Sequence, residues 1–581
     1  MRKELLLLGA FGMLTTATLC AQEFHLQPTP QEYITQKDSV DIPRQYQILS
    51  GNSVQDGPAL PLLRSLMPEE VLGASFRVYI GVKGDKIIKK YQHRIPRKSE
   101  GYFLKIEKDC IVIAGADERG AYYGVQTLAQ LLALDKLPLA EVTDYPDVPY
   151  RGVVEGFYGA PWSQEARIRQ LDFYGRNKMN VYIYGPKDDP YHRTPNWRKP
   201  YPAREGEELK VLVNRAKENN VIFYWAIHPG QDIRWNEEDR SLLLQKFESM
   251  YQLGVRGFAV FFDDISGEGT KADKQAELLN YIDDHFVKVK RDVAPLILCP
   301  TEYNKSWTDV EGGYLTTLGD KLNEGIKVMW TGDMVVATID KSTLDFVNPL
   351  LKRKAYIWWN FPVSDYVQDH LLLGPVYGNG LDIKDDMSAF VSNPMEHAEA
   401  SKISLYSVAD YTWNMENYDS ETSWKHAVRD LMPLHAEYLE IFAAHNSDPG
   451  QNGHRFRREE SVAIQPALSA LLKAYQEKNE IDEDAYRQVA EECRKIIVAA
   501  DGLLASGNEN RPLITEIRPW LIQFKQVGEY GAEVLNMIRL RQQKDAFIGS
   551  YEHARALLVL MGETDAQYKA GIKSGLSLIH I

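Results

Sequence analysis

The chain has 581 residues, 44% of them hydrophobic, and its 67 lysines and arginines against 81 aspartates and glutamates give a formal net charge of −14. This length predicts roughly three to four globular domains, and the negative charge argues against a partner with a phosphate backbone, nucleic acid included. The four cysteines, Cys20, Cys110, Cys299 and Cys493, form no CxxC or Cys/His cluster, so the sequence indicates neither a disulfide framework nor a structural zinc site.

The chain begins with "MRKELLLLGAFGMLTTATLCAQ", which has a basic start, an apolar stretch and small residues before Gln22. This pattern predicts a signal peptide over residues 1–21 and a periplasmic or secreted protein. A lipoprotein acylated at Cys20 is less favoured, because Leu19 stands where a small residue is usual. Beyond this stretch no apolar run is long enough to span a membrane.

Residues 22–147 read as a small α/β domain. The runs "SFRVYIGV" and "GYFLKIEKDCIVIAGAD" have the composition of strands, and "RGAYYGVQTLAQLLAL" has the period of an amphipathic helix. The proline-containing segment "EVTDYPDVPYRG" predicts the boundary with the next domain.

Residues 148–455 alternate apolar, β-rich runs with longer amphipathic segments, and the rhythm predicts a (β/α)₈ barrel. The eight predicted strands are "RGVVEGFYG", "MNVYIYGPKDD", "NVIFYWAIHPG", "RGFAVFFDDI", "PLILCPTEYN", "IKVMWTGD", "KAYIWWNFPVSD" and "KISLYSVADYTWN". After residue 455 helical periodicity replaces the strand pattern, as in "EDAYRQVAEECRKIIVAADGLLA", so residues 456–581 predict a helical bundle.

Polar residues follow most of the predicted strands, and in a barrel these ends converge on one face. They are Glu155, Asp188, Asp189, His228, Asp263, Asp264, Glu302, Asp333, Asn360, Asp365, Asp410 and Asn414. Asp263 and Asp264 are the sharpest case, because a strand buried on both faces offers no low-cost place for unpaired carboxylates. Two adjacent carboxylates suit acid/base catalysis, in which one stays ionised while the other carries a proton.

Aromatic and amide residues recur near the same strand ends and predict a sugar pocket with apolar walls and a few polar anchors. They are Tyr158, Tyr303, Trp330, Trp358, Trp359, Asn360 and Asn393. We interpret His192, beside Asp188 and Asp189, as part of a hydrogen-bond network in preference to a metal ligand, and His228 as a packed residue that could alternatively supply a base. We expect no metal and no cofactor.

The segments "VVEGFYGAPWS", "YIYGPKDDPYH", "AIHPGQDI", "FAVFFDDISGEG", "CPTEYN", "MWTGD" and "IWWNFPVSDY" together resemble the bacterial members of glycoside hydrolase family 84, the O-GlcNAcase family. The resemblance extends from about Gln22 to about residue 570. It implies retaining hydrolysis of terminal β-linked N-acetylglucosamine, in which the acetamido oxygen of the substrate attacks the anomeric carbon and forms an oxazoline. This route is an exception to the usual scheme with two enzyme carboxylates.

The resemblance also implies a role for each matching residue. Asp263 would orient and polarise the acetamido N–H, Asp264 would protonate the leaving oxygen and then activate water, and Tyr303 would donate to the acetamido or oxazoline oxygen. The residues implied to hold the sugar hydroxyls are Gly156, Lys187, Asn360, Asp365 and Asn393. Those implied to line the N-acetyl pocket are Cys299, Thr331, Val335 and Trp358.

Two alternatives stay open at this point. One is a hyaluronidase-like enzyme or a broader β-hexosaminidase, and the other is a catalytically inactive barrel that binds carbohydrate. The tail "GIKSGLSLIHI" departs from the family pattern, so we expect a truncated C-terminus. The sequence defines neither the natural glycan nor the oligomeric state.

Overall fold

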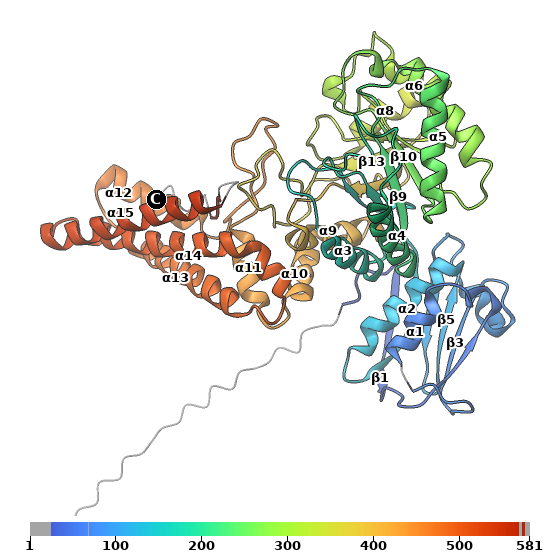
Figure 1. Ribbon diagram of the computed structural model, residues 1–581. Helices are drawn as coiled ribbons and strands as arrows, with labels where there is room; N and C mark the ends of the chain where they lie inside the picture. The colour runs from blue at the N-terminus through green and yellow to red at the C-terminus, as the bar shows by residue number, and fades with distance from the viewer. Residues whose placement is uncertain (1–24, 68, 569–571, 576–581) are drawn as a thin grey trace, which may run out of the picture.

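The computed structural model describes residues 25–67, 69–568 and 572–575, which form an N-terminal α/β domain, a closed barrel and a C-terminal helical domain (Figure 1). The predicted fold class is thereby confirmed. The N-terminal and helical domains extend from the barrel in different directions. The predicted signal peptide, residues 1–21, lies outside the described residues. No helix in the described part of the chain is long and apolar enough to cross a membrane.

The N-terminal domain is a six-stranded mixed sheet with helices on one face. Its strands lie in the order β1-β6-β4-β5-β3-β2. They span β1 (Glu32–Val40), β2 (Gln47–Ser50), β3 (Arg77–Val82), β4 (Tyr102–Ile106), β5 (Cys110–Gly115) and β6 (Leu137–Asp144). Helices α1 (Ala59–Leu66) and α2 (Glu118–Leu132) cover one face, and the 3₁₀ helix η2 (Lys86–Arg94) packs on the other.

Eight parallel strands close the barrel, with β14 hydrogen-bonded to β7. They are β7 (Arg151–Glu155), β8 (Val181–Tyr184), β9 (Ile222–Ile227), β10 (Gly257–Phe261), β11 (Ile297–Cys299), β12 (Lys327–Trp330), β13 (Ala355–Trp359) and β14 (Met387–Ser392). On β10, Ala259 and Phe261 point into the barrel, whereas Phe258 and Val260 pack against the helices outside. Both faces are apolar, and therefore the strand reads as a continuous apolar run.

Helices surround the strands and continue into the last domain. Around the barrel lie α3 (Gln164–Arg176), α4 (Ala203–Glu218), α5 (Glu237–Gln252), α6 (Ala272–Ile282), α7 (Tyr314–Lys321), α8 (Lys341–Leu351) and α9 (Ala398–Trp413). Helix α10 (Ser420–Leu431) packs against α9, and α11 (Ala436–Ala444) packs against the helices of the last domain (Figure 1). The helical domain consists of α12 (Gln465–Lys478), α13 (Glu483–Ala505), α14 (Arg511–Leu540) and α15 (Lys544–Gln567).

The eighth strand differs from the prediction. The run "KISLYSVADYTWN" is not a strand but most of helix α9, and the barrel is closed by the earlier and shorter β14. Every residue of α9 is buried, so its sequence lacks the polar face that would have marked a helix. Asp410 and Asn414 consequently lie away from the mouth of the barrel. Asp410 accepts a hydrogen bond from the Thr29 N–H over 2.7 Å, and Asn414 donates to the Pro30 carbonyl over 3.0 Å.

Candidate active site

A cavity of about 380 Å³ opens at the carboxyl ends of the barrel strands. All twelve residues that the sequence resemblance implicates line it: Gly156, Lys187, Asp263, Asp264, Cys299, Tyr303, Thr331, Val335, Trp358, Asn360, Asp365 and Asn393. They come from the ends of seven strands and the loops that follow them, which is the arrangement that barrel enzymes use for catalysis.

The backbone explains how two successive aspartates reach the same cavity. Successive side chains on a strand point to opposite faces, but β10 ends at Phe261, and Asp264 has a φ of 53°. This left-handed conformation is uncommon outside glycine and is tolerated best by asparagine and aspartate. It reverses the alternation, so that the carboxylates of Asp263 and Asp264 both line the cavity.

Asp263 is held as a carboxylate. Lys187 Nζ donates to its Oδ2 over 2.8 Å, and His228 Nε2 lies 3.3 Å from its Oδ1 and 2.8 Å from its backbone oxygen. Burial alone would raise the pKa of Asp263, but the charges and hydrogen bonds of Lys187 and His228 outweigh it and hold the pKa well below its usual range. Burial alone would lower the pKa of Lys187, but the negative charge of Asp263 outweighs it, and the pKa of Lys187 is raised.

Among the described residues, Asp264 has hydroxyl partners and forms no ion pair. Tyr158 donates to its Oδ2 over 2.9 Å, and Tyr303 donates to its Oδ1 over 2.8 Å. Burial raises the pKa of Tyr158 to about 12 and raises that of Tyr303 further, with the Asp264 charge acting in the same direction. Both hydroxyls therefore keep their protons near neutral pH and act as donors. The two neighbouring carboxylates thus have different surroundings, which is how acid and base roles are separated.

The floor of the cavity is apolar and closely packed. It is formed by the buried thiol of Cys299, by Val335 and by the Trp358 ring. A Cβ added to Gly156 would lie 2.5 Å from Trp358 Cζ2, so only glycine allows this approach. The raised pKa of Cys299, caused first by its burial, keeps the thiol neutral.

Amide groups form the polar side of the cavity near β13 and β14. Asn360 Oδ1 accepts from Trp358 Nε1 over 2.8 Å and from Asn393 Nδ2 over 2.9 Å. Asn360 Nδ2 donates to the Val335 carbonyl over 2.7 Å, and Asn393 Oδ1 accepts from the Gly156 N–H over 3.3 Å. These bonds fix the orientation of both amides.

Six further residues line the cavity without having been assigned a role from the sequence. They are Tyr158, Trp307, Val336, Val363, Tyr366 and His454. Of these, the sequence marks Tyr158 alone, as an aromatic residue near a strand end. His454 lies beyond the last barrel helix, and its ring meets that of Tyr366 edge-on at 4.9 Å. No local pattern links His454 to the barrel, because it follows β14 by about sixty residues and packing alone brings it to the mouth.

Several polar residues near strand ends do not reach the cavity. Glu155 is fully buried and bound by Arg167 and Tyr182, and Glu302 accepts from the Asp309 N–H over 3.1 Å. Trp330 and Trp359 belong to the core outside the barrel, not to the pocket. His192 lies between the backbone carbonyls of Pro186 and Ala226, as part of a hydrogen-bond network.

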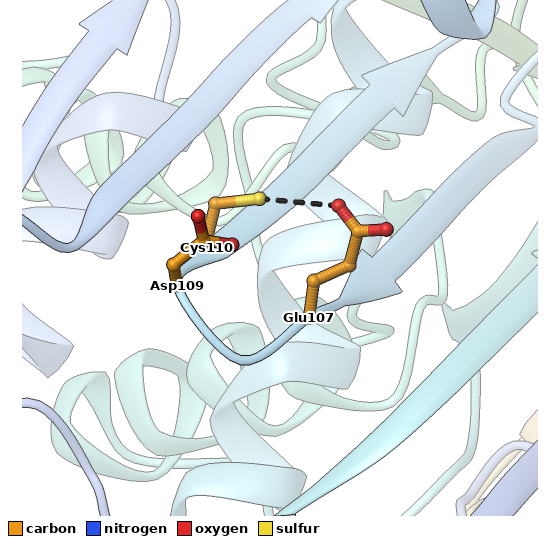
Figure 2. A group of neighbouring side chains, drawn as sticks. All are labelled: Glu107, Asp109 and Cys110. Carbon is orange, nitrogen blue, oxygen red and sulfur yellow. Dashed lines mark hydrogen bonds between the residues drawn. The ribbon is translucent and has the colours of Figure 1, made fainter.

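Among the described residues, one group of three brings possible metal-binding atoms within 4.8 Å of one another: Glu107, Asp109 and Cys110 (Figure 2). It lies at the turn between β4 and β5, in a different domain from the cavity. The Cys110 thiol donates to Glu107 over 3.4 Å, and burial together with this bond raises its pKa to about 12. A thiol must lose its proton to bind a metal, so this turn is poorly suited to hold one near neutral pH.

A parallel barrel that presents adjacent carboxylates beneath aromatic walls is typical of glycoside hydrolases. Residues 151–444 match the family model described as beta-N-acetylglucosaminidase. Residues 460–580 match the post-catalytic domain of bacterial GH84, and residues 23–145 match domain 2 of glycosyl hydrolase family 20.

Individual proteins give the same result. The Protein O-GlcNAcase of Rattus norvegicus is 35% identical over 276 residues, which are 46% of this chain and 30% of the rat protein. The chain thus spans less than a third of the length of this curated relative. The structure of CpGH84B superposes with a TM-score of 0.87 and 31% identity over 95% of this chain and 98% of its own. For CpGH84D the TM-score is 0.86 and the identity 28%, over 96% and 98% of the two chains. The chain belongs to the beta-N-acetylglucosaminidases of glycoside hydrolase family 84.

Proposed function

We propose that this chain is a retaining exo-β-N-acetylglucosaminidase that hydrolyses terminal β-linked N-acetylglucosamine by substrate-assisted catalysis. The observation that carries the proposal is the ion pair between Lys187 and Asp263, which holds an ionised carboxylate beside a second one, Asp264. Family membership supplies the substrate class. The ion pair favours the specific mechanism, because an ionised Asp263 can accept the acetamido N–H and so increase the negative charge on the acetamido oxygen.

In this mechanism the acetamido oxygen attacks the anomeric carbon while Asp264 gives a proton to the leaving oxygen. In the second step Asp264 takes a proton from the water that opens the oxazoline. Tyr303 is placed to change partners, because its hydroxyl already donates to Asp264 over 2.8 Å. When it turns to the acetamido oxygen, one oxygen of Asp264 becomes free to carry the proton that the leaving group needs.

The pocket floor favours the substrate as the source of the nucleophile. Cys299, Thr331, Val335 and Trp358 line this floor, and we infer that they take the acetamido methyl group, which would hold the acetamide under the anomeric carbon. The carboxylates among the described lining residues are Asp263, Asp264 and Asp365. Glu155 is not available as a nucleophile, since both of its oxygens are bound by Arg167.

Recognition of the sugar hydroxyls falls to polar groups around the rim. The residues proposed to bind them are Gly156, Lys187, Asn360, Asp365 and Asn393. The predicted signal peptide leads us to propose that the enzyme works in the periplasm or outside the cell. There it would meet glycans of a host or of the diet more readily than intracellular glycoproteins. Cell fractionation and a glycan screen test this, and turnover of O-GlcNAc peptides alone would contradict it.

The experiment that tests the mechanism compares aryl β-N-acetylglucosaminides whose acetamido methyl group carries zero to three fluorines. Fluorine withdraws electron density from the acetamido oxygen, so we expect the rate to fall steeply along the series. A flat series would mean that an enzyme carboxylate attacks the anomeric carbon. The absence of turnover with every substrate would instead favour the inactive, sugar-binding barrel.

A further inference from the structure

The two faces of the N-terminal sheet have different surroundings. Val78, Ile80 and Leu104 face α1 and α2, in a core that also takes in Trp413 of the barrel domain. On the other face Ile88 and Ile95, from η2 and its end, pack against Phe103 and Val112. The 3₁₀ helix η2 therefore lies on the side of the sheet that α1 and α2 leave uncovered.

This segment is strongly basic in an acidic protein. Residues 83–98, "KGDKIIKKYQHRIPRK", contain seven lysines and arginines against one aspartate, whereas the whole chain has a net charge of −14. Because Ile88 and Ile95 are buried against the sheet, the basic side chains of the segment turn outward. We call the exposed cations that form no ion pair with a described residue the basic surface: Lys83, Lys86, Lys89, Lys90 and Arg97. Lys98 is also exposed, but it lies 3.9 Å from Asp147.

Neighbouring acidic groups do not neutralise the basic surface. Glu141 is paired with Arg94 at 2.9 Å and with Lys105 at 3.1 Å, and Lys105 also holds Glu107 at 2.9 Å. The Asp85 carboxylate accepts from the Val82 N–H and from Ser53. Within the described residues, no carboxylate forms an ion pair with any of the five cations of the basic surface. The five cations therefore create a local positive potential on a protein whose net charge is negative.

We propose that the basic surface binds an anionic polysaccharide, whose sulfate or carboxylate groups would hold the enzyme on a polymer while the barrel cavity works on terminal sugars. Clusters rich in lysine and arginine are typical of heparin-binding surfaces, where each lysine acts as a point charge. Binding a polymer at two sites raises the effective concentration of substrate at the cavity. The choice of a glycan rests on the proposed function, but binding by the basic surface does not.

Two other polyanions fit less well. Among the described residues, none of the exposed large hydrophobic side chains belongs to residues 83–98. The basic surface therefore has no apolar group to insert into a membrane. Tyr91 is the one tyrosine, tryptophan or phenylalanine of residues 83–98, and one face of its ring is stacked on Phe103 with ring centroids 6.1 Å apart. The surface therefore has no series of rings on which successive bases of single-stranded nucleic acid could stack.

The test uses the whole protein and two matched triple variants. One replaces the centre of the basic surface, Lys86→Gln, Lys89→Gln and Lys90→Gln. The control replaces three exposed lysines of the helical domain that form no ion pair with any described residue, Lys473→Gln, Lys478→Gln and Lys544→Gln. Both remove the same charge. A double variant, Lys83→Gln with Arg97→Gln, probes the edges of the same surface.

We expect the wild-type protein to be retained on immobilised heparin near neutral pH in about 0.1 M salt, despite its negative charge. The basic-surface triple variant should pass through, the control should be retained, and the double variant should elute at intermediate salt. Affinity for dextran sulfate should fall about tenfold or more in the triple variant. The slope of the logarithm of the binding constant against the logarithm of the salt concentration should become shallower by about two, because each of the three lost contacts to a flexible polyanion releases less than one counterion. Uncharged dextran should not bind, and turnover of an aryl N-acetylglucosaminide should not change.

Three results would overturn the proposal. They are failure of the wild-type protein to bind either sulfated polymer, equal loss of binding in the control variant, and equal or tighter binding to phosphatidylglycerol vesicles or duplex DNA at the same salt. Because binding is measured without turnover, failure here is distinguishable from failure of the proposed catalytic function.

Discussion

The two ends of the barrel both contain buried ion pairs, but only one of them faces an opening. At the amino end, Arg151 at the start of β7 binds Glu100 over 2.6 Å, and Lys178 binds Asp144 over 3.0 Å. The ring of Trp413 covers both cations, at 4.8 Å from Arg151 and 4.5 Å from Lys178. At the carboxyl end, Lys187 and the buried Asp263 make an ion pair of 2.8 Å, with the cavity beside them.

A buried ion pair therefore does not by itself mark a functional site. At the amino end each charge meets an opposite charge, an amide or an aromatic face, so the network joins the N-terminal domain to the barrel. At the carboxyl end Asp263 is ionised, and the donors that reach Asp264 from the described residues are two hydroxyl groups. Part of the capacity of the two carboxylates to accept protons and hydrogen bonds therefore remains for a ligand. In barrels of this kind the amino end generally serves stability, whereas the carboxyl end carries the active site.

The largest expected effect concerns Asp264 itself. Asp264→Asn should lower kcat/KM on the order of 10²- to 10⁴-fold for glycosides with poor leaving groups, because the variant cannot protonate the leaving oxygen. The loss should be much smaller for activated aryl glycosides. The control is Asp188→Asn, an exposed carboxylate after β8 that does not line the cavity, which should leave both rates close to wild type. An equal loss on both substrate classes would reject the acid role.

The next largest effect tests the amino end. Glu100→Gln leaves the Arg151 charge buried without its partner, and we expect the free energy of unfolding to fall by about 3–5 kcal/mol. The matched control is Glu208→Gln, which breaks the exposed Arg204–Glu208 pair on α4 and should cost no more than about 0.5 kcal/mol. Urea denaturation measures both. A change in KM of the folded Glu100→Gln variant would show that the two ends are not independent.

The smallest effect tests whether the positive charge of Lys187 keeps Asp263 ionised at the carboxyl end. Lys187→Met removes the cation that lowers the pKa of Asp263, so this pKa should rise. In the wild type the carboxylate, and with it activity, persists as pH falls toward that low pKa. In the variant the acidic limb of the kcat/KM profile should therefore move to higher pH, with a loss of about 10- to 100-fold at its optimum. Lys305→Met, at the same end but outside the cavity, should leave the limb in place. An unchanged limb in Lys187→Met would mean that Asp263 does not need its charge.

Much of the fold and site follows from the sequence, because both depend on local patterns. Seven strands were predicted since each is a short run of β-branched and aromatic residues closed by a polar residue. The eighth was not predicted. Strand β14, "MSAFVS", has few β-branched or aromatic residues, while the wholly buried helix α9 has the more strand-like composition. Tertiary burial overrides propensity here.

The site residues divide in the same way. Asp263 and Asp264 could be predicted from their place at the end of a buried strand together with the neighbouring motifs, although an isolated pair of aspartates can equally be two solvated loop residues or a helix cap. The partner that keeps Asp263 ionised could not, because the contact with Lys187 joins residues 76 positions apart. Residues of long loops, such as Tyr366 and His454, likewise carry no periodic signal that would place them at the cavity.

The position of His454 limits how this enzyme can be divided. The side chain enters the cavity from the segment between α11 and α12, where Asp448 binds Arg457 and accepts from the Arg458 N–H over 2.8 Å. Arg458 in turn donates to the Pro375 carbonyl over 2.7 Å and so fastens this segment to the barrel. A minimal catalytic fragment that stopped at the last barrel helix would lose one wall of its pocket. Engineers who wish to graft a different post-catalytic domain onto this barrel should therefore place the junction after residue 460.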